Sequence, residues 1–116
     1  MGITYITAEV KNKNKKCFVK FLVDSGATYS VLPENVWNEL KLKPKREVIL
    51  TLADGEEIKR NVSECFITIP QGEGHSPVIL GKDNDKPLLG AVTLENLGLV
   101  LNPLNRTLKP MKMLLA

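Results

Sequence analysis

Residues 21–27 read Phe21-Leu22-Val23-Asp24-Ser25-Gly26-Ala27, an apolar run that ends in an aspartate, a serine and a glycine. All three are turn-forming residues, so an ordinary turn after a strand would explain them on their own. The preceding strand is apolar on nearly both faces, which is typical of a buried strand. We therefore expect Asp24 to lie in the core, where its charge needs hydrogen-bond donors or a shared proton. The Ser25 hydroxyl and the backbone N–H of Gly26 can supply such donors.

Apolar residues on both sides of this segment alternate with a period of two, which predicts strands. Strands are expected over residues 6–10, 17–23, 30–32, 48–52, 58–62, 65–69, 77–80 and 99–101, and short helices over 34–40 and 91–97, the second ended by Gly98. Asp54-Gly55 predicts a hairpin with a type I′ turn. A parity change of the apolar residues near Ser63-Glu64 predicts a bulge or bend, and residues 70–77 are expected to be a loop. Without a β-α-β rhythm, the pattern predicts a small all-β barrel or sandwich.

Composition limits the protein classes that remain. The chain has 116 residues, of which 43% are hydrophobic and only 5% aromatic, so we expect one domain over 1–116 with an aliphatic core. The net charge of +3 is mild and favours no dedicated nucleic-acid binder. Cys17 and Cys65 are expected to be reduced, buried thiols, which together with the lack of a signal-peptide pattern or an apolar span predicts a cytoplasmic protein.

Several other segments resemble ligand-binding motifs but lack residues that those motifs require. Gly81-Lys82 resembles part of a phosphate loop, but Asp83 stands where a Ser or Thr must bind magnesium. Asp83 and Asp85 lack the glycine-centred loop and distal Glu of a calcium site. His75, the only histidine, is expected at the surface. The lysines within residues 11–16 are expected to form a solvated hairpin tip, because no aromatic or Arg residue is interleaved with them. We therefore expect no metal, no cofactor and no nucleic-acid partner.

Residues 21–27 resemble the catalytic strand and loop of the retroviral-type (retropepsin-like) aspartyl proteases, and the chain is similar to the small cellular relatives of that family. Ser30-Val31-Leu32 resembles the family's apolar return strand. Leu50 to Arg60, with Asp54-Gly55 at its tip, occupies the place of the flap hairpin. Leu88-Leu89-Gly90 matches the second signature, which packs beneath the catalytic loop. This chain departs from the viral pattern in two ways, because its flap is not glycine-rich and its C-terminal tail is longer. These departures affect the expected substrate contacts and the expected dimer sheet, and they leave the catalytic loop unchanged.

The resemblance implies a small closed barrel with one or two short helices, in which Asp24 is catalytic and Ser25, Gly26 and Ala27 orient it. Family chemistry needs two aspartates facing one water, and the chain has one such segment. It therefore implies a symmetric homodimer with one Asp24 from each subunit, hydrolysing a peptide or protein substrate without metal or cofactor. The segments 3–10 and 99–115 are the expected dimer sheet. The alternative is a non-catalytic dimeric peptide-binding module with the same fold, which the intact Asp24-Ser25-Gly26 argues against.

Overall fold

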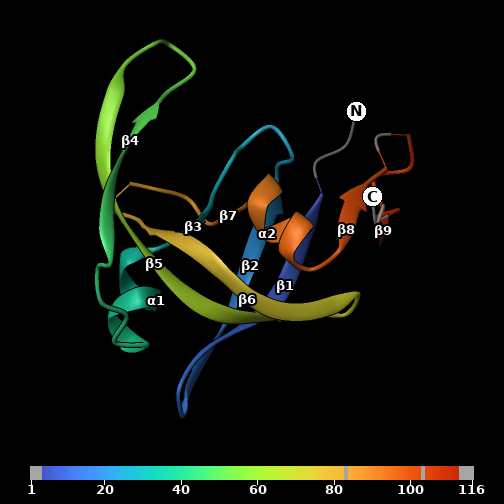
Figure 1. Cartoon of the computed structure of the whole chain (residues 1–116), viewed down its shortest axis with the longest axis horizontal. Coiled ribbons are helices and arrows are strands. Elements are labelled where there is room, and N and C mark those ends of the chain that lie inside the picture. Colours follow the sequence, from blue (N-terminus) through green and yellow to red (C-terminus); the bar gives the residue numbers. More distant parts are fainter. Residues whose placement is uncertain (1–3, 83, 103, 113–116) are drawn as a thin grey trace, which may run out of the picture.

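The computed structural model describes residues 4–82, 84–102 and 104–112 (Figure 1). Along the chain its elements are β1 (Tyr5–Asn12), β2 (Lys15–Val23), β3 (Ser30–Leu32), α1 (Glu34–Glu39), β4 (Arg46–Thr51), β5 (Glu57–Ile69), β6 (Gly72–Leu80), β7 (Leu88–Leu89), α2 (Ala91–Asn96), β8 (Leu99–Leu101) and β9 (Leu108–Pro110). Asp83, and residues 3, 103 and 113–115 of the expected dimer sheet, lie outside the described residues. Among the described residues, neither helix is long and apolar enough to cross a membrane.

The main sheet closes on itself. Its order is β1-β2-β7-β3-β6-β5-β4, and β1 also pairs with β5 from Glu9↔Thr68 to Lys11↔Phe66. Because β4 pairs only with the first part of β5, the β4–β5 hairpin projects from the closed part as an arm, at the upper left of Figure 1. This closure confirms the expected all-β barrel with two short helices. The core cluster is almost wholly aliphatic: Ala8, Val10, Val19, Phe21, Val23, Leu32, Val36, Leu40, Leu42, Cys65, Ile67, Ile69, Val78, Leu80, Leu89, Leu94, Leu99 and Leu101.

Of the bulge or bend expected near Ser63-Glu64, strand β5 rules out the bulge. It is one strand of 13 residues, and its register with β6 runs unbroken from Asn61↔Leu80 to Ile69↔Gly72. The parity of its buried residues changes because the two halves bury opposite faces of the strand. Ile58, in the arm, faces a pocket, whereas Cys65 and the later alternate residues face the core.

The expected loop over residues 70–77 is also wrong, since β6 begins at Gly72 and only a tight turn separates it from β5. The glycines that suggested a loop mark a close approach of β6 to the end of α2. A Cβ at Gly74 would lie 3.3 Å from Leu97 Cδ2, and one at Gly72 would lie 3.5 Å from the Leu97 carbonyl oxygen. Here the glycines serve packing and leave the strand intact.

The turn of the β4–β5 hairpin differs from the expected type I′ geometry. Only Gly55 has a positive φ, at 88°, and its N–H donates to the Leu52 carbonyl at 2.9 Å. The Leu52 N–H in turn donates to the Glu56 carbonyl at 2.8 Å. This is a three-residue connection with a glycine in the left-handed region at its end, a common alternative to the two-residue turn. The hairpin itself is confirmed.

The second helix ends as the sequence predicts. Gly98 has φ 72° and donates its N–H to the Glu95 carbonyl at 2.9 Å, so it closes α2 in the left-handed conformation that glycine favours. The chain then continues into β8, which pairs with β9 in a separate two-stranded sheet. The strand β9 was not expected from the sequence, because three residues with one apolar side chain at its start give no alternation to detect.

Candidate active site

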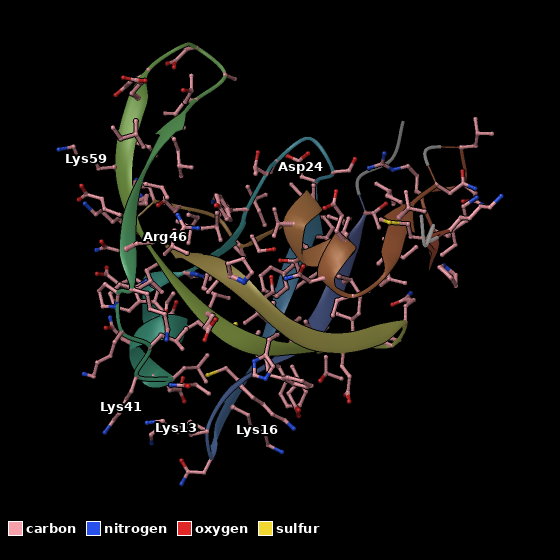
Figure 2. The ribbon with its side chains drawn as sticks, in the orientation of Figure 1. Lys13, Lys16, Asp24, Lys41, Arg46 and Lys59 are labelled. Carbon is pink, nitrogen blue, oxygen red and sulfur yellow. The ribbon has the colours of Figure 1, made fainter. Side chains whose placement is uncertain are left out.

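Asp24 follows the last residue of β2, where the chain leaves the sheet in a tight turn. The turn is closed by the Ala27 N–H, which donates to the Asp24 carbonyl at 3.1 Å, and the Asp24 N–H donates to the Leu89 carbonyl at 3.0 Å. Asp24 is half-buried and its neighbours Ser25 and Gly26 are exposed, so the expectation of a core aspartate is wrong for the single chain. The strand is buried, but the turn that follows it reaches the surface of the barrel (Figure 2).

Of the two expected donors to the carboxylate, the structure supplies the backbone one. The Gly26 N–H donates to Asp24 Oδ1 at 3.0 Å. A Cβ at Gly26 would stand 3.2 Å from that same oxygen, so a larger residue would crowd the carboxylate. The Ser25 hydroxyl forms no hydrogen bond within the described part of the chain. The carboxylate therefore keeps Oδ2 for another ligand, and Ser25 keeps its hydroxyl.

Leu88-Leu89-Gly90 lies beneath this turn, as the second signature implies. Leu88 and Leu89 pair in parallel with Leu22 and Val23, and Leu88 also pairs with Val31. Gly90 has no room for a side chain, because a Cβ there would lie 2.5 Å from the Tyr29 carbonyl oxygen.

The start of α2 also holds the loop after Asp24. The Ala91 N–H donates to the Ala27 carbonyl at 2.8 Å, and the Val92 N–H donates to the Thr28 carbonyl at 2.9 Å. Two free N–H groups of the first helical turn are thereby satisfied by loop carbonyls instead of by a capping side chain. The loop that carries Asp24 is consequently fixed to α2 by its backbone.

A chain of three buried hydroxyls lies under the same loop, and sequence reasoning missed it. Ser30, Ser76 and Thr93 are at most 1% exposed. The Gly90 N–H donates to Ser30 Oγ at 2.9 Å, Ser30 Oγ contacts Thr93 Oγ1, Thr93 Oγ1 contacts Ser76 Oγ at 2.7 Å, and Ser76 Oγ donates to the Pro77 carbonyl at 3.0 Å. Since the Ser76 proton goes to Pro77, Thr93 donates to Ser76 and Ser30 donates to Thr93. The only sequence signal is a small hydroxyl residue within otherwise apolar runs.

A pocket of about 740 Å³ lies between the catalytic loop and the β4–β5 arm. One wall comes from Gly26 to Tyr29 and the opposite wall from Ile49 to Leu52 with Ile58. The lining includes Gly26 and Ala27 but not Asp24. Asp54 and Gly55 stand beyond the pocket at the exposed tip of the arm, where a Cβ on Gly55 would meet nothing within 4 Å. The pocket has the mainly apolar lining and the size of a ligand cleft.

An ion pair joins the base of the arm to the segment before β7, within the lining of this pocket. Arg60 Nε donates to Asp85 Oδ2 at 2.7 Å and its NH2 group donates to Oδ1 at 3.2 Å, so the contact is bidentate. The hydrogen bond from Arg60 lowers the pKa of Asp85, and the Lys82 N–H adds a donor at 2.9 Å. Asp85 thus pairs with arginine, and the described residues contain no cluster of metal-binding side chains.

The remaining nucleophile and base candidates are poorly placed for catalysis. Cys65 faces the core, and burial raises its pKa to about 12. Burial, with Glu39 as a second cause, also raises the pKa of the half-buried Cys17. His75 is exposed on β6 and contacts the Phe66 ring edge-on at 5.1 Å between centroids. A thiol needs a lowered pKa to act as a nucleophile, so Asp24 is the strongest candidate of this site.

Comparison with known proteins agrees with this geometry. A family model described as gag-polyprotein putative aspartyl protease matches residues 7–96. The matched range contains the Asp24 turn, the β4–β5 arm and Leu88-Leu89-Gly90. None of the curated proteins compared with the chain matches it.

Proposed function

The chain belongs to the gag-polyprotein aspartyl protease family, which indicates a protease-type function, and from this premise we propose that it is an aspartic endopeptidase. The active unit is a symmetric homodimer in which each subunit contributes one Asp24. The observation that carries the proposal is the half-buried Asp24 carboxylate, held on Oδ1 by the Gly26 N–H beside a pocket of peptide size. No metal or cofactor is needed for this chemistry.

The two Asp24 carboxylates share one proton, because two like charges a few ångström apart do not both ionise readily. The charged carboxylate takes a proton from a water molecule, whose oxygen attacks the carbonyl carbon of the scissile peptide bond. The protonated carboxylate gives its proton to the carbonyl oxygen, which forms a tetrahedral diol. When the diol collapses, a proton passes to the amide nitrogen, the C–N bond breaks, and a carboxylic acid and an amine are released.

The number of aspartates and the openness of the site support a homodimer. Ser25 is exposed, and neither its hydroxyl nor Oδ2 of the half-buried Asp24 has a partner among the described residues, so both groups can bind to a second subunit. The described parts of the expected dimer sheet, residues 4–10, 99–102 and 104–112, supply its contacts. They already lie near the catalytic strand, since the Val23 N–H donates to the Thr4 carbonyl at 2.8 Å and Arg106 Nε donates to Thr4 Oγ1 at 3.3 Å.

The substrate is an extended peptide that lies in the pocket beneath the β4–β5 arm. Leu50 and Leu52 of the arm face the catalytic loop across the pocket, and Ile58, which pairs with Leu50, completes an apolar wall. The arm acts as a flap that closes over the peptide, in a manner that requires its exposed tip to move. Asp54 and Gly55 belong to that moving tip and not to the reacting atoms.

The test uses two copies of the chain joined in tandem, so that each Asp24 can be changed separately. We expect digestion of a peptide library by the wild-type tandem and its loss in the variants with one or two Asp24→Asn changes, all with unaltered melting. Equal cleavage by the variants would overturn the assignment. Peptide binding without cleavage by the wild type would instead support a non-catalytic peptide-binding module. The nearly isosteric Asn preserves the shape of the loop, so a loss of folding is not expected.

A further inference from the structure

One outer face of the sheet carries aromatic rings and lysines together. Paired residues of neighbouring strands project from the same face, so a row of His75, Phe66, Lys11 and Lys16 crosses β6, β5, β1 and β2. Phe18 lies on the same face two residues beyond Lys16. We call this surface the basic-aromatic face and define it by Tyr5, Lys11, Lys16, Phe18, Lys20, Phe66 and His75.

Two of the aromatic rings on this face are exposed although the protein has few aromatic residues. Phe18 is 68% exposed and Tyr5 54%. Of the three Phe, one Trp and two Tyr in the chain, Phe21 is the only one in the core cluster. Lysines lie beside the exposed Tyr5 and the half-buried Phe66: Lys20 Nζ is 5.1 Å from the centroid of Tyr5, and Lys11 Nζ is 5.9 Å from that of Phe66. Grouped apolar rings at a surface mark an interaction site more often than single ones do.

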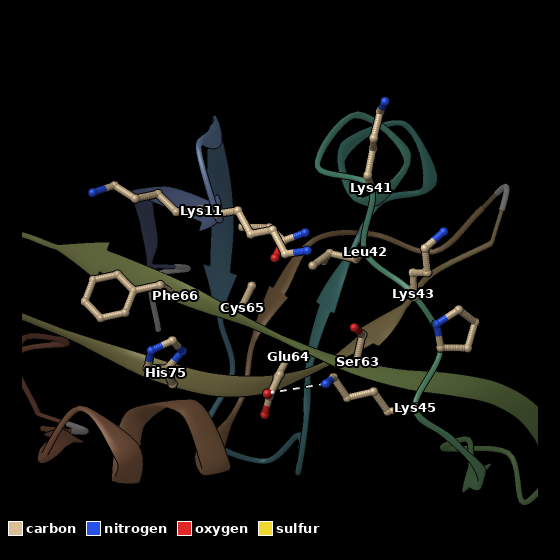
Figure 3. A pocket seen from close by; sticks show the side chains of 13 residues that line it. Lys11, Lys41, Leu42, Lys43, Lys45, Ser63, Glu64, Cys65, Phe66 and His75 are labelled. Atoms are coloured by element: carbon tan, nitrogen blue, oxygen red, sulfur yellow. Dashed lines mark ion pairs between the residues drawn. The ribbon is translucent and has the colours of Figure 1, made fainter.

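The basic-aromatic face continues into a pocket of about 760 Å³ that is framed by lysines (Figure 3). The tip of the β1–β2 hairpin contributes Lys11 and Lys13, and the segment after α1 contributes Lys41, Lys43 and Lys45. Both basic segments lie at the end of the molecule opposite Asp24 (Figure 2). They are held together by a hydrogen bond of 2.8 Å from Asn12 Nδ2 to the Leu40 carbonyl.

Two of these lysines occupy positions where the backbone favours other residues. Lys13 and Lys41 have φ of 57° and 56°, in the left-handed region that suits glycine and asparagine. A lysine there costs conformational energy that an asparagine would avoid. This conformational cost indicates that the lysine charges at the tips of the two segments have a function.

Of the acidic residues near this surface, Glu9 and Glu64 pair with lysines, whereas Glu39 lies beside Cys17. Glu9 Oε1 lies 3.4 Å from Lys11 Nζ, and Glu9 Oε2 lies 3.9 Å from Lys16 Nζ. Glu64 pairs with Lys45 at 3.6 Å, and Glu73 accepts a hydrogen bond from Thr68. Lys13, Lys41 and Lys43 have no carboxylate within 4.0 Å in the described part of the chain, so the pocket retains positive charge.

We propose that the basic-aromatic face and its lysine-framed pocket bind single-stranded nucleic acid. Exposed rings on a sheet give bases a stacking surface, and lysines neutralise the phosphates between them. An acidic peptide would use the lysines alone and would leave Phe18 and Phe66 unexplained. Along the sequence only the lysines within residues 11–16 indicate nucleic-acid binding, because the aromatic residues are interleaved with the lysines across strands and not along the chain. This binding is independent of the proposed peptidase site.

The experiment measures fluorescence anisotropy of labelled single-stranded DNA and RNA of about twelve nucleotides, a length that one sheet face can cover. We expect Phe18→Leu to weaken binding roughly 5- to 150-fold, the range for losing a stacked base, and Phe18→Trp to retain it. Lys13→Asn with Lys41→Asn should reduce the salt slope of log K by about 0.7 for each phosphate that is no longer neutralised. These asparagines suit the local backbone, so the variant should melt no lower than the wild type. Lys82→Gln removes one charge from the segment before β7 and should leave affinity unchanged.

Four results would overturn the proposal. The first is an affinity that does not depend on salt. The second is equal affinity of the Phe18→Leu variant, which would leave charge alone as the cause. The third is full competition by polyglutamate, which would favour an acidic peptide. A second copy of the chain on this face would appear as self-association that Phe18→Leu abolishes, and it too would contradict the proposal.

Discussion

The hydroxyl chain beneath the catalytic loop predicts a large effect of Thr93→Val. Valine keeps the shape of threonine but removes the hydroxyl that accepts from Ser30 and donates to Ser76. The Ser30 proton is then buried without an acceptor, at a cost of about 1–3 kcal/mol, and the lost bond to Ser76 adds about 1 kcal/mol. We therefore expect the free energy of unfolding to fall by about 2–4 kcal/mol. In a domain of this size, that lowers Tm by about 8–16 °C.

The assay is urea unfolding followed by circular dichroism, at one protein concentration because a dimer's stability depends on it. The midpoint should fall at an unchanged m value, which identifies a change of stability. Thr51→Val makes the same chemical change at an exposed site of β4 and should stay within about 0.5 kcal/mol of the wild type. Thr93→Ser keeps the hydroxyl and should retain most of the stability. The reasoning is refuted if Thr93→Val is as mild as Thr51→Val, or if Thr93→Ser costs as much as Thr93→Val.

Two predictions concern pH and thiol chemistry. Arg60 lowers the pKa of Asp85 in the folded protein below its ordinary value of 3.8. The pair therefore stabilises the fold fully at pH values above 3.8, and this contribution is lost as the pH falls through the lowered pKa of the folded state. Melting curves of Asp85→Asn should show a smaller loss of stability than the wild type as the pH falls below 3.8; equal losses would mean that the pair does not contribute. Burial raises the pKa of Cys65 from 9.0 to about 12. The contribution of the neutral buried thiol to stability is therefore fully present below pH 9.0 and is lost as the pH rises toward 12. A thiol reagent at neutral pH should label Cys17 before Cys65, as mass spectrometry of the labelled peptides can check, and the reverse order would contradict the burial.

The local parts of the site could be predicted from the sequence because short-range chemistry determines them. An apolar strand followed by Asp24-Ser25-Gly26 has few local solutions, and Gly98 ends α2 where left-handed backbone is needed. The errors arose where one signal had two physical causes. Gly72 and Gly74 suggested a loop, but the same absence of a side chain allows β6 to approach α2. The parity change in β5 suggested a bulge, but a strand that buries different faces along its length gives the same pattern.

The features that sequence reasoning missed depend on contacts between distant residues. Ser30 and Thr93 are 63 residues apart, and each alone resembles an ordinary small polar residue in an apolar run. Arg60 and Asp85 meet only because β5 pairs with β6 and the chain then turns back toward the arm.

The basic-aromatic face follows the same principle, since Lys11 meets Phe66 through the β1–β5 pairing that closes the barrel. A single closure therefore has two consequences. It buries the aliphatic side chains of β1 and β5 inside the barrel, and it brings the rings and lysines of their opposite sides into one row outside. Because side chains alternate along a strand, a register shift of one residue would exchange the two sets and expose the core. The register that the core requires thus also fixes the composition of the outer face, and the arrangement of rings and lysines there is as well determined as the core itself.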